Sequence, residues 1–111
     1  MKVYLSGPMR GIPEFNFPQF HDATEWLRLQ DHIVFNPAEH SYPTEDLRAA
    51  FSRDTEWLCG WADAVALLPG WHNSKGAKAE CALALALGLE VYYLHEMPSR
   101  EWYLTKAEDL G

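Results

Sequence analysis

Short apolar runs typical of β-strands alternate with longer runs of helical spacing, and this alternation constrains the fold more than any other feature of the chain. The strand-like runs lie at residues 2–6, 32–35, 64–68 and 90–94. The helix-like runs lie at residues 16–30, 44–61 and 75–87, with a short terminal helix expected at 99–110. Such alternation predicts a parallel sheet with helices on both faces, joined by right-handed crossovers. We therefore expect one α/β domain over residues 1–111.

Several residues mark where the helices begin and end. Asn16 is a candidate cap for the first helix, with Pro18 in its first turn. Thr44 is expected to begin the second helix, and Ser74 is a candidate cap for the third. Gly88 follows the last apolar position of that third helix and is expected to end it.

The charge of the chain limits the partners that it can bind. Nine Lys and Arg stand against sixteen Asp and Glu, which gives a formal net charge of −7. Long DNA or RNA needs clustered basic residues, so a long nucleic acid is excluded as a partner. A single small phosphate needs only one or two basic groups, so a nucleotide remains possible. Since a domain of 111 residues buries only about two thirds of its surface, we also expect a homodimer.

The cysteines and histidines indicate neither a disulfide framework nor a metal site. Cys59 and Cys81 both lie in helical apolar runs and are expected to be buried free thiols. The five histidines have no ligand spacing, so no metal or other cofactor is expected. The longest apolar stretch, residues 81–87, is too short to span a bilayer, and no signal peptide precedes the first strand. We expect a soluble cytoplasmic protein.

Ligands of parallel α/β sheets bind at the carboxyl ends of the strands, so candidate site residues are sought there. The loop after the first strand carries Ser6, Gly7, Arg10 and Gly11. Its glycines allow backbone N–H groups to approach an anion, and Arg10 adds a fixed positive charge. An ordinary Gly-Pro turn is the alternative interpretation of this loop.

The loop after the third strand leads into a helix that carries one conspicuous carboxylate. Ser74 and Gly76 lie at the helix start, where free N–H groups attract anions. Glu80 follows about one turn later on an otherwise almost wholly apolar helix. A Glu there can simply complement the helix dipole. The functional interpretation is a carboxylate that the dipole keeps ionised, with a depressed pKa, and that points into the cleft.

Other polar residues divide between the two edges of the predicted sheet. Asn36 and His40 follow the second strand at the ligand edge and are further candidates for substrate binding, and His72 lies at the same edge. Asp54 lies in the middle of the second helix, where a surface acid paired with a neighbouring base is the usual explanation. Asp63 precedes the third strand, at the wrong edge for catalysis, and is expected to be structural.

Trp57 and Trp61 are four residues apart and share a helix face. Packing in the core or in a dimer interface is the preferred interpretation of this pair, and a base-stacking platform is the alternative.

Five fragments together resemble the nucleoside 2-deoxyribosyltransferase superfamily, over about residues 2–94. They are Tyr4-Leu-Ser-Gly-Pro-Met-Arg-Gly11, Phe35-Asn-Pro37, Asp54-Thr-Glu-Trp-Leu58, Ala62-Asp-Ala-Val65 and Ser74-Lys-Gly-Ala-Lys-Ala-Glu80. Within it, the chain is similar to small uncharacterised phage and bacterial members and to the 2'-deoxynucleoside 5'-phosphate N-hydrolases. The resemblance implies a flavodoxin-like, three-layer α/β/α fold with a four- to five-stranded parallel sheet, and a homodimer.

The resemblance also implies roles for individual residues. Glu80 matches the nucleophile that attacks the anomeric carbon of a 2-deoxyribose, and Asp54 matches the acid that assists departure of the base. Tyr4 matches a tyrosine that hydrogen-bonds near the nucleophile. Arg10, Gly11 and Ser74 match groups that hold a 5'-phosphate, although Pro8 and Met9 replace a small polar residue that often helps to bind it.

These roles fit cleavage of a glycosidic C–N bond through a covalent deoxyribosyl ester, resolved by water or by a second base. Hydrolysis and transfer both remain open. A nucleotide-binding protein without turnover is the main alternative. A structural or interaction module, suggested only by the apolar third helix and the Trp pair, is the third.

Overall fold

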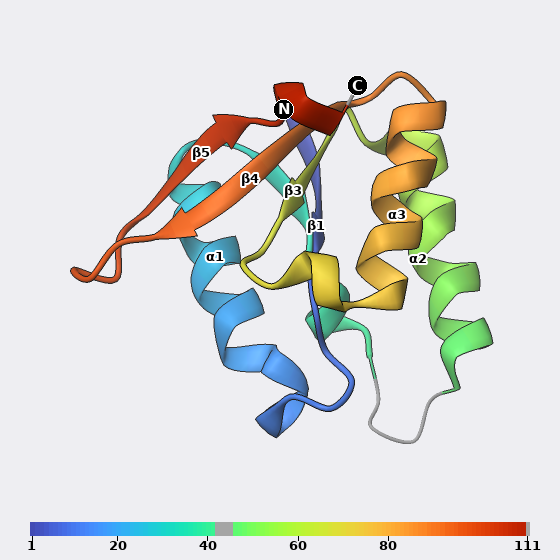
Figure 1. Ribbon diagram of the computed structural model, residues 1–111, viewed down its shortest axis with the longest axis horizontal. Helices are drawn as coiled ribbons and strands as arrows, with labels where there is room; N and C mark the ends of the chain where they lie inside the picture. The colour runs from blue at the N-terminus through green and yellow to red at the C-terminus, as the bar shows by residue number, and fades with distance from the viewer. Residues whose placement is uncertain (42–45, 111) are drawn as a thin grey trace.

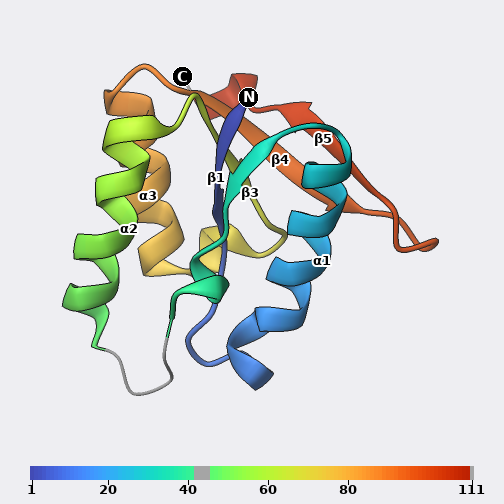
Figure 2. The same cartoon turned by 180° about the vertical axis from the view of Figure 1, so that it is seen from behind.

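The computed structural model describes residues 1–41 and 46–110 and contains one five-stranded sheet with helices on both faces (Figure 1). The strands are β1 (Lys2–Ser6), β2 (Ile33–Phe35), β3 (Ala64–Leu67), β4 (Glu90–Glu96) and β5 (Trp102–Lys106). The helices are α1 (Phe17–Leu29), α2 (Leu47–Trp61) and α3 (Lys75–Ala86). The sheet order is β2-β1-β3-β4-β5, with β1 to β4 parallel and β5 antiparallel to β4. α1 covers one face, and α2 and α3 cover the other (Figures 1 and 2). This is the expected flavodoxin-like three-layer α/β/α fold.

The prediction of a terminal helix at residues 99–110 is wrong. The chain instead turns back at Met97, whose N–H donates to the Glu101 carbonyl at 2.8 Å, and then forms β5. Arg100 adopts a left-handed φ of 66°, which lets the turn close. Trp102 is buried against the α1 side of the sheet, so pairing with β4 removes a large apolar side chain from water. A short 3₁₀ turn, Glu108–Leu110, follows the strand.

Alternation along β1 divides the core into two layers. Val3 and Leu5 face α1 and pack with Phe20 and Leu27. Tyr4 belongs to the opposite layer, which includes Leu58 of α2 and residues of α3. Since successive side chains of a strand point to opposite faces, Ser6 shares the face of Tyr4. β1 therefore presents two hydroxyl groups to the side on which α2 and α3 lie.

The helix caps agree with the sequence in part. The Ser74 hydroxyl accepts from the Ala77 N–H at 3.1 Å, as predicted for the cap of α3. α2 begins at Leu47 with Asp46 as its cap, and the predicted start at Thr44 lies outside the described residues. Asn16 does not cap α1 through its side chain, because its backbone is left-handed and the amide is used elsewhere.

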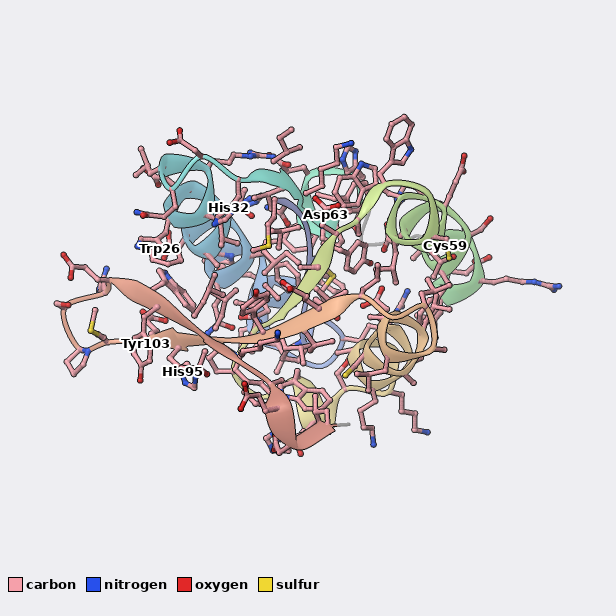
Figure 3. All side chains as sticks on the ribbon, turned by 90° about the horizontal axis from the view of Figure 1, so that it is seen from above. Trp26, His32, Cys59, Asp63, His95 and Tyr103 are labelled. Carbon is pink, nitrogen blue, oxygen red and sulfur yellow. The ribbon has the colours of Figure 1, made fainter. Side chains whose placement is uncertain are left out.

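Two predictions about side chains on α2 and α3 hold in part. Cys81 is buried as expected, but Cys59 on α2 is exposed (Figure 3), because α2 turns its neighbour Leu58 toward the sheet. Trp57 packs in the core, with its ring centroid 5.2 Å from that of Phe35. Trp61 is 60% exposed, with the Lys2 ammonium 5.3 Å from its ring centroid, so it is not part of the core.

No helix within residues 1–41 and 46–110 combines the length and apolar character needed to cross a membrane.

Candidate functional site

A cavity of about 550 Å³ lies at the carboxyl edge of the sheet, where the sequence placed the candidate residues. The end of β1, the loops after β1 and β3, and the N-terminal parts of α1, α2 and α3 line it, together with Pro37 and Ser41 after β2. All three helices begin at this edge, on the two sides of β1 (Figures 1 and 2). The cavity therefore crosses the end of β1 and is open to groups from both faces of the sheet.

Glu80 lines the cavity from the second turn of α3 and is only 9% exposed. Both of its carboxylate oxygens are held by hydroxyl groups of β1. The Tyr4 hydroxyl donates to Oε2 at 2.5 Å, and the Ser6 hydroxyl donates to Oε1 at 2.7 Å. Ser6 also lines the cavity, whereas Tyr4 does not. Two residues of one strand thus fix the orientation of the buried carboxyl group.

The pKa of Glu80 is raised from 4.5 to about 7, so the prediction of a depressed pKa is wrong. Burial is the largest cause, since it removes water from the charged form. The hydrogen bonds from Tyr4 and Ser6 lower the pKa, and the charge of Asp54 raises it again. Desolvation therefore outweighs the stabilisation that the two hydrogen bonds give. The raised pKa brings protonation of Glu80 into the neutral pH range.

The environment of Tyr4 keeps its hydroxyl protonated. Burial raises its pKa well above 10, and the negative charges of Glu80 and Asp54 raise it further. Its ring stacks on Phe35 with centroids 5.5 Å apart, and Phe35 stacks in turn on His40. Tyr4 is therefore a fixed hydrogen-bond donor to Glu80 rather than a group that changes charge.

Asp54 lines the same cavity from α2 and is buried, so it is not the surface acid of the usual explanation. The pairing expected for such an acid does occur, because Arg53 Nε lies 2.9 Å from Asp54 Oδ1. Arg53 also donates to the His40 carbonyl at 3.1 Å. The ion pair is thus anchored to the segment that follows β2.

Four residues predicted for substrate binding line the cavity with Ser6: Gly7, Arg10, Ser74 and Gly76. A Cβ on Gly7 would lie 2.7 Å from the Leu68 Cβ, so the close approach of the two strand ends requires glycine there. Arg10 is exposed at the cavity wall. Ser74 and Gly76 bring the start of α3 to the same space, so these positions can meet an anionic ligand.

Other predicted residues lie away from the cavity wall. Asn36 is buried, and its amide bonds to the Ala38 N–H and the His21 ring instead. His40 contributes its ring to the stack on Phe35. Gly11 and His72 are exposed and do not line the cavity. Asp63 accepts from the Lys2 N–H at 2.8 Å at the opposite edge of the sheet, which confirms its structural role.

The apolar wall of the cavity was not predicted. Five large apolar side chains from the loop after β1 and from α1 and α2 contribute to it: Ile12, Phe15, Phe17, Leu47 and Phe51. Two amides, Asn16 and Gln19, lie on the α1 side. The sequence does contain a feature that could have indicated this wall. The loop after β1 is rich in Gly and Pro but also contains Ile and Phe, which a fully solvated loop does not need.

The cavity thus combines a buried carboxyl group, a second acid and a basic group with an apolar wall. Within residues 1–41 and 46–110, no cluster of three His, Cys, Asp or Glu side chains could hold a metal ion. The arrangement suits general acid–base or nucleophilic chemistry on a ligand that is part polar and part apolar.

Comparison with known proteins identifies the family of the chain. No curated protein and no solved structure matches it. A family model described as a domain of unknown function (DUF4406) matches residues 1–93, from β1 into β4 and therefore across the whole cavity. The chain belongs to the DUF4406 family.

Proposed function

We propose that this protein cleaves or exchanges the N-glycosidic bond of a 2'-deoxynucleoside or its 5'-monophosphate. The observation that carries the proposal is Glu80, a carboxyl group with a raised pKa that lines a cavity and is oriented by two hydroxyls. A carboxyl group in a cleft whose pKa is raised by burial is more typical of an active site than of a structural position. The resemblance to the nucleoside 2-deoxyribosyltransferase superfamily supplies the substrate class.

In the proposed reaction, the ionised Glu80 attacks C1' of the sugar as the C–N bond to the base breaks. The bond electrons leave with the base, and Asp54 in its protonated form supplies the proton that neutralises it. The product on the enzyme is a deoxyribosyl ester of Glu80. Water or a second base then attacks C1' as the bond from C1' to the Glu80 oxygen breaks, which regenerates the carboxylate. Asp54 takes up the proton that the attacking group loses and so returns to its protonated form. The Tyr4 and Ser6 hydroxyls keep the carboxylate in one orientation throughout.

The same proposal assigns the 5'-phosphate to the positive part of the cavity. Arg10, Ser74 and Gly76 line it together, and Lys75 adds a second cation. A deoxynucleotide is a cytoplasmic metabolite, so the proposed enzyme works in the cytoplasm. We also propose that the protein forms a homodimer. Light scattering tests this by measuring the mass of the protein in solution.

Release of free base tests the proposed activity. Each of the common deoxynucleosides and their 5'-monophosphates is incubated with the protein, and the products are separated by chromatography. We expect free base with the wild type and none with Glu80→Ala. Glu56→Ala, an exposed position on α2, is the matched control and should retain activity. An exchanged nucleoside in the presence of a second base indicates a transferase, whereas base release that survives Glu80→Ala refutes the role of Glu80.

Nucleotide binding without turnover is the second candidate, and one observation favours it. Both oxygens of Glu80 are bonded by the protein's own hydroxyls, and its raised pKa disfavours the ionised form that a nucleophile needs. Such a carboxyl group can serve as a fixed polar contact instead of a nucleophile. Calorimetric binding of a deoxynucleotide, with no base released after long incubation, would support this candidate over the first.

A further inference from the structure

The α1 side of the cavity carries two amide side chains that the proposed chemistry does not use. Asn16 precedes α1 and Gln19 lies in its first turn, and both are half-buried in the cavity wall. α1 covers the opposite face of the sheet from α2 and α3 (Figure 2). The amides therefore lie across the end of β1 from Asp54 and Glu80, so a ligand held by Glu80 can extend toward them.

The hydrogen bonds that Asn16 and Gln19 make within the protein determine which of their amide atoms remain for a ligand. Asn16 Nδ2 lies 2.9 Å from the Pro8 carbonyl oxygen, which can only accept, so the Asn16 amide must present its NH₂ group there. The same NH₂ group donates to Gln19 at 2.8 Å, so the contacting atom of Gln19 must be its oxygen. Among the described residues, Asn16 Oδ1 and Gln19 Nε2 then have no hydrogen-bond partner.

These two atoms form an acceptor and a donor that belong to one bonded pair of amides. Their complement is a ligand group with a donor beside an acceptor. The edge of a nucleobase has this pattern, as amide pairing with adenine in other protein–nucleic acid contacts illustrates.

Aromatic and apolar side chains flank the amide pair. Phe15 and Phe17 line the cavity on either side of Asn16 in sequence, with their ring centroids 6.0 Å apart. Glu14, Phe15 and Asn16 all have left-handed φ values, between 53° and 60°, which L-residues rarely adopt in succession. The bonds from Asn16 to Pro8 and Gln19 help to hold this segment. A flat aromatic ligand group would find both stacking surface and edge contacts here.

We propose that Asn16 and Gln19 form a base-recognition subsite, in which Asn16 Oδ1 accepts from a nucleobase edge and Gln19 Nε2 donates to it. This inference rests on the proposed function, since it assigns the base of the proposed substrate to the α1 side of the cavity. The subsite binds the planar heterocycle and leaves the sugar to Glu80.

Gln19→Glu tests the subsite with little change of shape. The oxygen that accepts from Asn16 is kept, while the free donor becomes an acceptor. Gln30→Glu, at the far end of α1, adds the same charge away from the cavity and is the matched control. Gln19→Met removes the donor without adding charge. All are made in a Glu80→Gln background so that the ligand is not consumed, and affinities are measured by calorimetry for the four 2'-deoxynucleoside 5'-monophosphates and for 2-deoxyribose 5-phosphate.

We expect at least one nucleotide to bind about tenfold or more tightly than 2-deoxyribose 5-phosphate, because only the nucleotide reaches the amides. Gln19→Glu and Gln19→Met should each weaken that nucleotide about tenfold and leave the sugar phosphate unchanged. Gln30→Glu should alter neither.

The subsite is wrong if the Gln19 variants leave nucleotide affinity unchanged or weaken both ligands equally. It is also wrong if the nucleotide binds no more tightly than the sugar phosphate. If neither ligand binds to any variant, the proposed nucleotide site itself fails, and the subsite fails with it.

Discussion

Replacing Glu80 by Gln should stabilise the folded protein at neutral and alkaline pH. The pKa of Glu80 is about 7 in the folded chain, against 4.5 for an ordinary Glu. Between these two values the unfolded chain is ionised and the folded chain is not, so rising pH favours unfolding. Each pH unit is worth about 1.4 kcal/mol, so the ionised group lowers the free energy of unfolding by about 3 kcal/mol above pH 7. Gln cannot ionise and is free of this loss.

Urea unfolding followed by tryptophan fluorescence, at intervals from pH 4 to pH 8.5, measures the effect. The difference in unfolding free energy between Glu80→Gln and the wild type should be smallest below pH 4.5. It should then grow in favour of the variant and level off above pH 7. The change with pH is the informative quantity, because Gln also alters the hydrogen bonds to Tyr4 and Ser6 by an amount that does not depend on pH.

Glu56→Gln is the matched control, since Glu56 is exposed on α2. Its stability should differ from that of the wild type by about the same small amount at every pH. The reasoning is refuted if the advantage of Glu80→Gln does not change between pH 4.5 and pH 8. It is equally refuted if the variant loses stability relative to the wild type as the pH rises, since Glu80 would then be stabilised in its ionised form.

Three further predictions concern hydrogen bonding, backbone packing and thiol exposure. Tyr4→Phe removes a hydrogen-bond donor from Glu80, so the pKa of Glu80 should rise above 7 and the free energy of unfolding should fall by about 1–2 kcal/mol. The ¹³C shift of the Glu80 carboxyl group, followed against pH, measures the pKa, and an unchanged titration midpoint would contradict the prediction. Gly7→Ala should lower the free energy of unfolding by about 1–3 kcal/mol, because the new Cβ would lie 2.7 Å from the Leu68 Cβ. Gly60→Ala has open space around it in α2 and should raise the free energy of unfolding by about 0.5–1 kcal/mol. Melting temperatures that shift in the same direction for both variants would contradict this pair of predictions. A thiol reagent should modify Cys59 in the native protein and Cys81 only after urea unfolding, and rapid native reaction of both thiols would show that the burial is wrong.

Much of the fold follows from local patterns in the sequence. The four parallel strands and three helices have periodicities that are readable within each segment, and their order fixes the edge at which the cavity forms. The failure at residues 99–110 has a different origin. Trp102 and its neighbours form β5 only because β4 is there to pair with them, and that contact is absent from any local pattern.

The candidate site was predictable where residue type and position sufficed. Glu80, Asp54 and Arg10 do meet in one cavity. The direction of the Glu80 pKa shift was not predictable, because burial is the largest cause of the shift and is a property of the assembled layers. The place of Asn36 was missed for a similar reason, since its amide is taken up by the turn after β2 and by His21.

β1 links the site to the pairing of the sheet. Val3 and Leu5 serve the layer beneath α1, while Tyr4 and Ser6 serve Glu80, and all four are successive residues of one strand. A slip of one residue would exchange the two pairs, placing hydroxyls in an apolar layer and apolar groups against a carboxyl. The hydrogen bonds to Glu80 therefore form only when β1 is in its native register, and they favour that register. A substitution at any of these four positions can therefore affect the site, because a shift of the β1 register disables the site even when every site residue is retained.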